Sequence, residues 1–163
     1  MSRMEPRTYP ASPHPEPEAI VVFCGDPRFQ AAIASFIAEE LHLQPGQFLP
    51  FSVPGGIASL SEQFARPKDF KVLKEGLEFY LTRLRTIRKV ILINHEDCKK
   101  YHDLCERLGP LSLVNGTVSD RQRSDLQKVT QVVSRILSET IEVQRYYAKF
   151  ANPEHTQVRF EAV

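Results

Sequence analysis

Apolar side chains follow two different periodicities along this chain. Short, nearly continuous apolar runs predict strands buried on both faces of a sheet, and these runs occupy residues 19–23, 48–53 and 89–94. Apolar side chains that recur every three or four positions predict helices, which begin at Pro27, near Asp69, at Cys98 and at Ser119. Two alternating stretches near the C-terminus predict further strands over 140–150 and 156–163.

Local signals sharpen three of these boundaries. Asp26 can cap the helix whose first position is Pro27. Ser119 and Gln122 have the spacing of a capping box, which predicts the start of the last helix. Pro50 cannot donate a hydrogen bond to a neighbouring strand, so the second strand is expected near an edge of the sheet.

Strands that alternate with helices predict an α/β fold, with a mostly parallel sheet flanked by helices and right-handed crossovers. If the second strand lies on the far side of the first, the strand order around the site is 2-1-3. The carboxyl ends of the first and third strands are then neighbours. Ligands of such sheets bind beyond the carboxyl ends of the strands, so this edge is where we expect a functional site.

The composition indicates one domain and excludes several partners. The chain has 163 residues, of which 1–17 form a proline-rich N-terminal arm and 18–163 a single α/β domain. The net charge is +1 and no basic tract appears, so no nucleic acid or anionic membrane is expected as a partner. The apolar runs are too short to span a bilayer.

Three cysteines indicate reduced thiols rather than disulfides in this chain. No apolar segment typical of a secretory leader appears at the start of the sequence, so a cytoplasmic location is expected. Under those conditions metal binding or catalysis is the first role to test for the cysteines.

The candidate metal ligands lie where two of the predicted strands end. Cys24 ends the first strand, and His95 and Cys98 end the third. Two thiolates and one imidazole make a three-ligand zinc set that leaves a fourth position for water or substrate. His102, one helical turn after Cys98, can be that fourth ligand or replace Cys24, and Cys105, two turns after it, is another candidate.

Asp26 and Arg28 follow the first ligand closely. The Asp26 carboxylate has three options, which are to cap the helix, to ligate the zinc, or to pair with Arg28. In the third case the fourth position stays free, and Asp26 can accept a hydrogen bond from a water bound there. In the second loop, Asp97 is interpreted as a local helix cap.

With C-x-D-x-R after the first strand and H-x-x-C after the third, the chain resembles the β-class carbonic anhydrases. The stretch LHLQPGQFLPFSVPGG between the two motifs looks like the same family, and the resemblance covers roughly residues 19–115. It implies a zinc lyase in which Cys24, His95 and Cys98 hold Zn²⁺ and Asp26 and Arg28 form a gating and orienting pair. It also implies a homodimer or a dimer of dimers, and reversible hydration of carbon dioxide to bicarbonate by zinc-bound hydroxide.

The sequence departs from this family at three places, namely Pro27, Val53-Pro54 and Lys99-Lys100. The lysine pair can narrow the site, attract an anion such as bicarbonate, or point to solvent. Two alternatives therefore stay open, a hydrolase of carbonyl sulfide or carbon disulfide, and a zinc-binding regulatory protein without turnover. The glycine backbone of 55–56 is expected to approach the substrate, and the expected pocket lining is Phe23, Phe48, Phe51, Val53 and Leu60.

Overall fold

The computed structural model describes residues 8–11, 16–62, 66–109, 116–136 and 141–163. The strands are β1 (Ala19–Cys24), β2 (Phe48–Val53), β3 (Lys89–His95), β4 (Glu142–Phe150) and β5 (Val158–Ala162). The helices are α1 (Pro27–Glu39), α2 (Ala58–Ser61), α3 (Pro67–Arg83), α4 (Lys99–Leu108) and α5 (Val118–Ile136).

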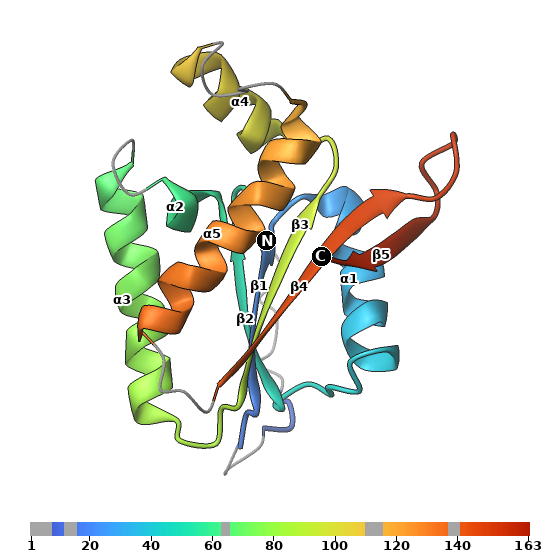
Figure 1. The fold of residues 1–163 in the computed structure, drawn as a ribbon. Helices are drawn as coiled ribbons and strands as arrows, with labels where there is room; N and C mark the ends of the chain where they lie inside the picture. Colours follow the sequence, from blue (N-terminus) through green and yellow to red (C-terminus); the bar gives the residue numbers. More distant parts are fainter. Residues whose placement is uncertain (1–7, 12–15, 63–65, 110–115, 137–140) are drawn as a thin grey trace, which may run out of the picture.

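The five strands form one sheet in the order β2-β1-β3-β4-β5 (Figure 1). The pairs that β1 makes with β2 and β3 are parallel, as is the pair of β3 with β4, and only β5 runs antiparallel to its neighbour. The structure therefore confirms the α/β class, the strand order 2-1-3 and the edge position of β2. The carboxyl ends of β1 and β3 lie side by side, which is where the sequence predicted a site.

Alternation of side chains along the buried strands divides the core into two layers. Val22 and Leu92 face α3 and α5, whereas Val21 and Ile91 face α1. Figure 1 shows the corresponding arrangement, with α3 and α5 on one side of the sheet and α1 on the other. Both layers are apolar, which is why the strands read as continuous hydrophobic runs.

Two helices differ in detail from the predictions. The helix α3 begins at Pro67, two residues before the predicted start near Asp69, and ends at Arg83, so Leu84 and Ile87 pack against the core from the connection to β3. The short helix α2 follows the glycine turn after β2 and was not predicted, because four residues carry no helical periodicity.

The predicted capping box of α5 is wrong by two residues. Thr117 precedes the helix, its Oγ1 accepts a hydrogen bond from the Asp120 N–H at 3.2 Å, and Asp120 accepts in return from the Thr117 N–H at 2.8 Å. Ser119 and Gln122 lie inside the helix and serve tertiary contacts instead. Residues 110–115, between α4 and α5, lie outside the described residues.

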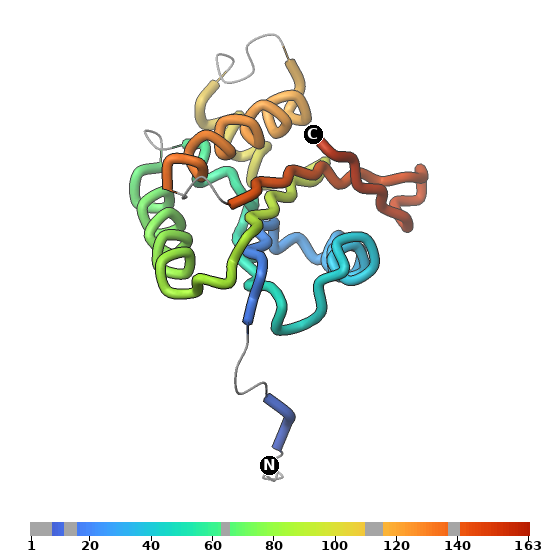
Figure 2. Tube along the Cα trace, turned by 60° about the horizontal axis from the view of Figure 1, so that its bottom comes forward, coloured from blue at the N-terminus to red at the C-terminus, as the bar shows by residue number. Residues whose placement is uncertain are grey.

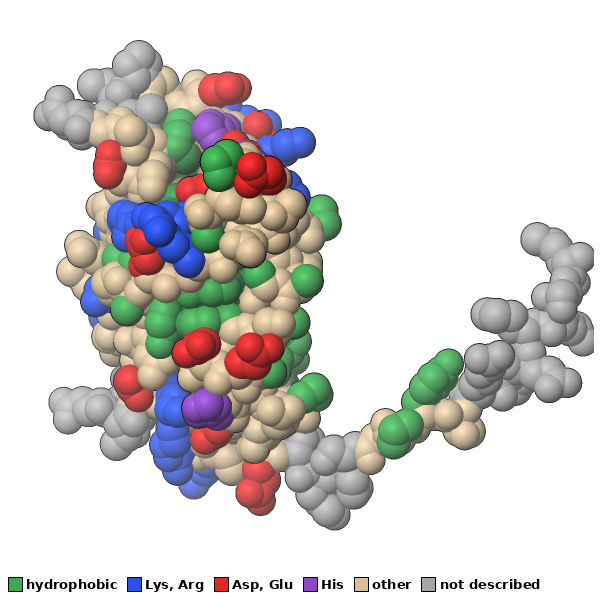
Figure 3. All heavy atoms as spheres, turned by 90° about the vertical axis from the view of Figure 1, so that its right-hand side faces the viewer, with side chains coloured by type: hydrophobic (Ala, Val, Ile, Leu, Met, Phe, Trp, Pro, Cys, Tyr) green, Lys and Arg blue, Asp and Glu red, His purple; other side chains and the backbone are tan. Residues whose placement is uncertain are grey.

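Residues 8–11 lie apart from the body of the protein in two different views (Figures 2 and 3). The division into an arm of residues 1–17 and a domain of 18–163 stays a prediction, because most of the arm lies outside the described residues. Within the part of the chain that the structure describes, no helix is long and apolar enough to cross a membrane.

Candidate metal centre

Three side chains from two neighbouring strand ends converge at the carboxyl edge of the sheet. The sulfur atoms of Cys24 and Cys98 and a ring nitrogen of His95 all lie within 4.8 Å of one another. All three residues are buried. Among the residues that the structure describes, this is the one group of three or more such side chains close enough to share a metal ion.

The distance between the two sulfur atoms suits a shared metal. It is 3.9 Å, whereas two sulfur ligands at ~2.3 Å from a tetrahedral zinc lie roughly 3.8 Å apart. A disulfide would need a sulfur–sulfur distance of about 2.05 Å. Both residues are free cysteines in this structure.

The imidazole of His95 is oriented as a metal ligand is. Its Nδ1 lies 2.8 Å from the carbonyl oxygen of Glu96, which fixes the ring and assigns the proton to Nδ1. The opposite nitrogen, Nε2, is buried and has no hydrogen-bond partner among the described residues. A buried nitrogen lone pair without a donor is costly, and a metal ion at this point would satisfy it.

Backbone N–H groups support charge on the two sulfur atoms. Gly55 donates to Cys24 Sγ at 3.3 Å, and the backbone N–H groups of Lys100 and Tyr101, at the start of α4, favour the charged form of Cys98. The hydrogen bond from Cys98 lowers the pKa of the Cys24 thiol well below its usual value, against the effect of burial. The same contact raises the pKa of Cys98, because a thiol facing a thiolate keeps its proton. The pair therefore already carries one negative charge, and a dication would favour loss of the second proton.

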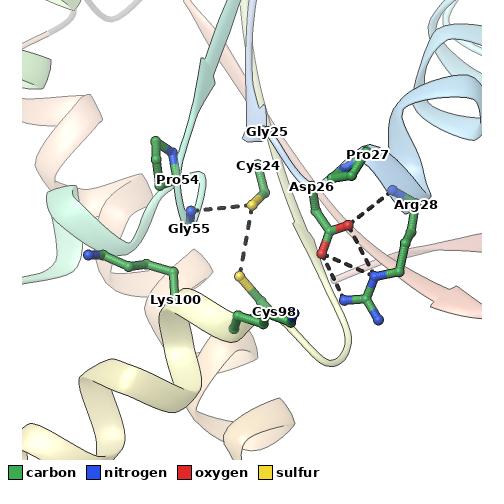
Figure 4. A pocket seen from close by; sticks show the side chains of 10 residues that line it. Cys24, Gly25, Asp26, Pro27, Arg28, Pro54, Gly55, Cys98 and Lys100 are labelled. Atoms are coloured by element: carbon green, nitrogen blue, oxygen red, sulfur yellow. Dashed lines mark hydrogen bonds and ion pairs between the residues drawn. The ribbon is translucent and has the colours of Figure 1, made fainter.

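Asp26 caps α1 and is held by Arg28 at the same time. One carboxylate oxygen accepts from the Arg28 backbone N–H at 3.0 Å, and the other accepts from Nη2 of the same residue at 2.7 Å (Figure 4). Hydrogen bonds from Arg28 lower the pKa of Asp26, so the carboxylate is ionised at neutral pH. Pro27 costs nothing here, because the first N–H of a helix has no partner within the helix.

Arg28 also reaches across to the loop that follows β3. Its Nη1 lies 2.7 Å from Asp97 Oδ2, and its Nη2 donates to the Asp97 carbonyl at 2.9 Å. The helix α4 begins without a side-chain cap, so the interpretation of Asp97 as a local helix cap is wrong. Arg28 thus ties together the two loops that carry the sulfur ligands.

Neither predicted fourth ligand joins the group. His102 lies 3.5 Å from Asp97, with a side chain 48% exposed, and Cys105 is buried on α4 outside the three-residue cluster. Asp26 faces Arg28 instead. Of the described side chains, none closes the fourth position, and a pocket of about 400 Å³ opens there.

The predicted apolar lining of this pocket is wrong. Phe23 and Phe48 pack in the layer against α1, and Phe51, Val53 and Leu60 pack in the layer against α3 and α5. Strand side chains point into the layers, whereas the pocket lies at the end of the sheet and is lined by loop residues. Its walls are the residues 24–28, Pro54, Gly55 and 98–100 (Figure 4).

A buried polar network behind His95 was not predicted. Gln122 on α5 donates to the His95 carbonyl at 2.7 Å and accepts from the Tyr147 hydroxyl at 3.0 Å. Asn94 donates to the Gln122 carbonyl and to the Tyr101 hydroxyl, at 3.2 Å each. The sequence did contain a signal for this network, because Gln122 lies on the same helical face as the apolar Leu126, Val129 and Val133, and a buried glutamine needs hydrogen-bond partners.

Comparison by sequence finds no relative of this chain, whereas comparison by structure finds many similar folds. No protein-family model matches the sequence, and no curated protein sequence matches it significantly. Among solved structures, a carbonic anhydrase from Streptococcus mutans has 13% identity and a TM-score of 0.55, with 94% of this chain and 87% of that chain covered.

Two β-carbonic anhydrases from fungi match in the same way. One from Aspergillus fumigatus has 14% identity and a TM-score of 0.57, with 90% of this chain and 76% of that chain covered. A tetrameric one from Sordaria macrospora has 15% identity and a TM-score of 0.52, with 90% and 81% covered. At such identities the likeness concerns the fold, and the chain has the fold of the β-carbonic anhydrases.

Proposed function

We propose that this protein is a zinc-dependent lyase that catalyses the reversible hydration of carbon dioxide to bicarbonate. One observation carries the proposal, which is the convergence of Cys24, His95 and Cys98 beside an Asp26 that is held by Arg28. A closed structural zinc site has four protein ligands and no use for such a pair beside an open position. The fold supports the same reaction class.

Cys24, His95 and Cys98 would hold Zn²⁺ through two sulfur atoms and Nε2. When bound, the zinc supplies a Lewis acid that makes water nucleophilic near neutral pH. Nδ1 of His95 donates to the Glu96 carbonyl, which keeps Nε2 aimed at the sulfur atoms. The Gly55 N–H, which donates to Cys24 Sγ, stabilises negative charge on that sulfur, and the first N–H groups of α4 favour the charged form of Cys98.

Asp26 accepts a hydrogen bond from the attacking water and so orients it toward carbon dioxide. Arg28 engages both carboxylate oxygens of Asp26, which keeps that side chain from becoming a fourth ligand. On the opposite wall, Pro54 and Gly55 offer no polar side chain. A linear apolar substrate therefore meets a polar acceptor on one side and an apolar wall on the other.

The test is stopped-flow hydration of carbon dioxide by zinc-loaded protein between pH 7 and 9. The wild-type protein should exceed the buffer rate, and Asp26→Ala should lower kcat/KM at least about tenfold. Asp103→Ala, which removes an exposed carboxylate from α4, is the matched control and should have no effect. A zinc-loaded protein with no rate above buffer would favour the alternative of a zinc-binding regulatory protein.

Hydrolysis of a related linear molecule such as carbonyl sulfide is the second candidate. It would use the same residues, and the apolar ring of Pro54 in the pocket wall favours a less polar substrate. The two activities should be compared on one preparation, because the ratio of kcat/KM values decides between them.

We also propose a cytoplasmic location and assembly as a homodimer or a dimer of dimers. Thiols that act as ligands need a reducing compartment, which supports the location. The tetrameric Sordaria macrospora protein shares the fold, and the face of β5 and α1 exposes apolar side chains between charged ones (Figure 3). Light scattering on the eluting protein would give the assembly directly.

A further inference from the structure

A second cavity lies beside the metal pocket and shares a wall with it. Its volume is about 370 Å³. Pro54 and Lys100 each line both cavities. The metal pocket contains Cys24 and Cys98, whereas the second cavity contains neither and opens between β2, α2 and α3. This second space has no part in the proposed hydration of carbon dioxide.

The stem of Lys100 forms the shared wall. A Cβ atom placed on Gly55 would lie 2.7 Å from Lys100 Cγ, so the aliphatic stem packs directly on that glycine. In Figure 4 the Lys100 ammonium lies on the side of Gly55 away from Cys24. The lysine therefore directs its charge toward the second cavity rather than toward the sulfur atoms.

The polar groups of the second cavity are suited to an anion. No described residue pairs with the Lys100 ammonium, and the hydroxyl of Ser59 makes no hydrogen bond within the described chain. Arg66 also lines the cavity, and it pairs with Asp69. Two cations against one carboxylate leave a formal charge of one, which a single carboxylate group would neutralise.

The rest of the lining is apolar. Val53 and Pro54 contribute one side, and Val72 and Leu73 of α3 contribute another. Val72 is 72% exposed, so its apolar side chain is accessible to a ligand. An apolar floor with a few convergent polar groups is the usual composition of a small-molecule site.

We propose that this cavity binds a small organic monocarboxylate. The carboxylate meets the Lys100 ammonium and the Ser59 hydroxyl, and the apolar body lies against Val53, Val72 and Leu73. Because Lys100 has a single ammonium, an occupant of this cavity holds it away from the metal pocket.

The probe for the test is benzoate, with benzamide as its uncharged analogue of the same shape. Each is titrated into the zinc-loaded protein and followed by backbone amide NMR shifts. Benzoate should shift the amides of Ser59, Val72 and Leu73, and benzamide should bind at least about tenfold more weakly. Shifts confined to Gly25 and Arg28 would place benzoate at the metal and overturn the proposal, as would equal binding of the two probes or no binding of benzoate.

Two lysine variants separate a built site from general attraction. Lys100→Met keeps most of the stem that packs on Gly55 and should weaken benzoate binding at least about tenfold. Lys99→Met removes the same charge one residue away and should change it less than about twofold. Equal effects of the two variants would overturn the proposal. Arg66→Gln gives a second variant with an expected loss, because it removes the other cation.

Discussion

Two strand–loop–helix corners supply the candidate metal ligands Cys24, His95 and Cys98, and different contacts hold each corner in place. The first, residues 24–28, runs from β1 into α1 and is organised by its own side chains, since Asp26 caps the helix and Pro27 begins it. The second, residues 95–100, runs from β3 into α4 and has no side-chain cap. It is held instead by Arg28 of the first corner and by Gln122 of α5.

The first corner is thus fixed by contacts within itself, and the second by contacts with residues distant in the sequence. Asp97 adopts a φ of 51°, in the left-handed region that aspartate tolerates better than most residues, and its contacts with Arg28 stabilise this conformation. Changes in the first corner should therefore affect the pocket through Asp26 and Arg28. Substitutions of distant residues such as Arg28 and Gln122 should affect the second corner.

The largest expected effect comes from removing one ligand of either corner. Cys24→Ser or Cys98→Ser should weaken zinc binding more than about 100-fold, since changes outside the ligands themselves already cost about 10–100-fold. Zinc per chain, measured by mass spectrometry after dialysis, should fall from about one to near zero. Cys105→Ser is the control and should keep its zinc. Full retention in both ligand variants would contradict the assignment.

Arg28 makes the ion pairs that join the two corners, and its loss ranks second. Arg28→Gln releases Asp26 and Asp97 together, so hydration of carbon dioxide should fall about 10–100-fold through misplacement of Asp26. Arg85→Gln removes an exposed guanidinium elsewhere and should leave kcat/KM unchanged. An active Arg28→Gln protein would mean that Asp26 needs no support.

Gln122 tests the claim that the second corner depends on α5. Gln122→Leu leaves the buried His95 carbonyl without a donor and the Tyr147 hydroxyl without its acceptor, so the free energy of unfolding should fall by about 1–3 kcal/mol. Gln127→Leu, on the exposed face of the same helix, should change it by less than about 0.5 kcal/mol. Urea denaturation measures both, and equal values would contradict the distant support.

The smallest effect is expected at Asp97. Its side chain is 56% exposed, so Asp97→Asn should reduce the free energy of unfolding by less than about 1 kcal/mol despite the ion pair with Arg28. The measurement is again urea denaturation, with Asp103→Asn as the comparison. A loss above about 2 kcal/mol would show that the loop itself is held by this carboxylate.

The same contrast explains what the sequence could predict. Buried strands, the cap at Asp26 and the helix start at Pro27 are local features, and their positions follow from residue type and spacing. The strand order 2-1-3 was one that the α/β pattern allowed, and given that order the convergence of two strand ends followed.

Contacts between distant segments could not be predicted in this way. Asp97 looked like a local cap but pairs with a residue 69 positions away. Ser119 and Gln122 had the spacing of a cap, yet Thr117 and Asp120 took that role and left the first two for Tyr147 and His95. The aromatic residues expected in the pocket were drawn into the two core layers, because strand side chains alternate between faces.

Gly56, in the turn after β2, limits which substitutions this chain can accept. A side chain at Gly56 would meet the backbone nitrogen of Cys24 and the backbone oxygen of Ile93 at 3.2 Å each, and its φ is +55°. Both are main-chain atoms of the strand ends that carry the candidate metal ligands, so an added side chain would have to displace the backbone there. A residue with a side chain is therefore strongly disfavoured at Gly56, because it would strain the turn and press on the backbone that positions Cys24 and His95.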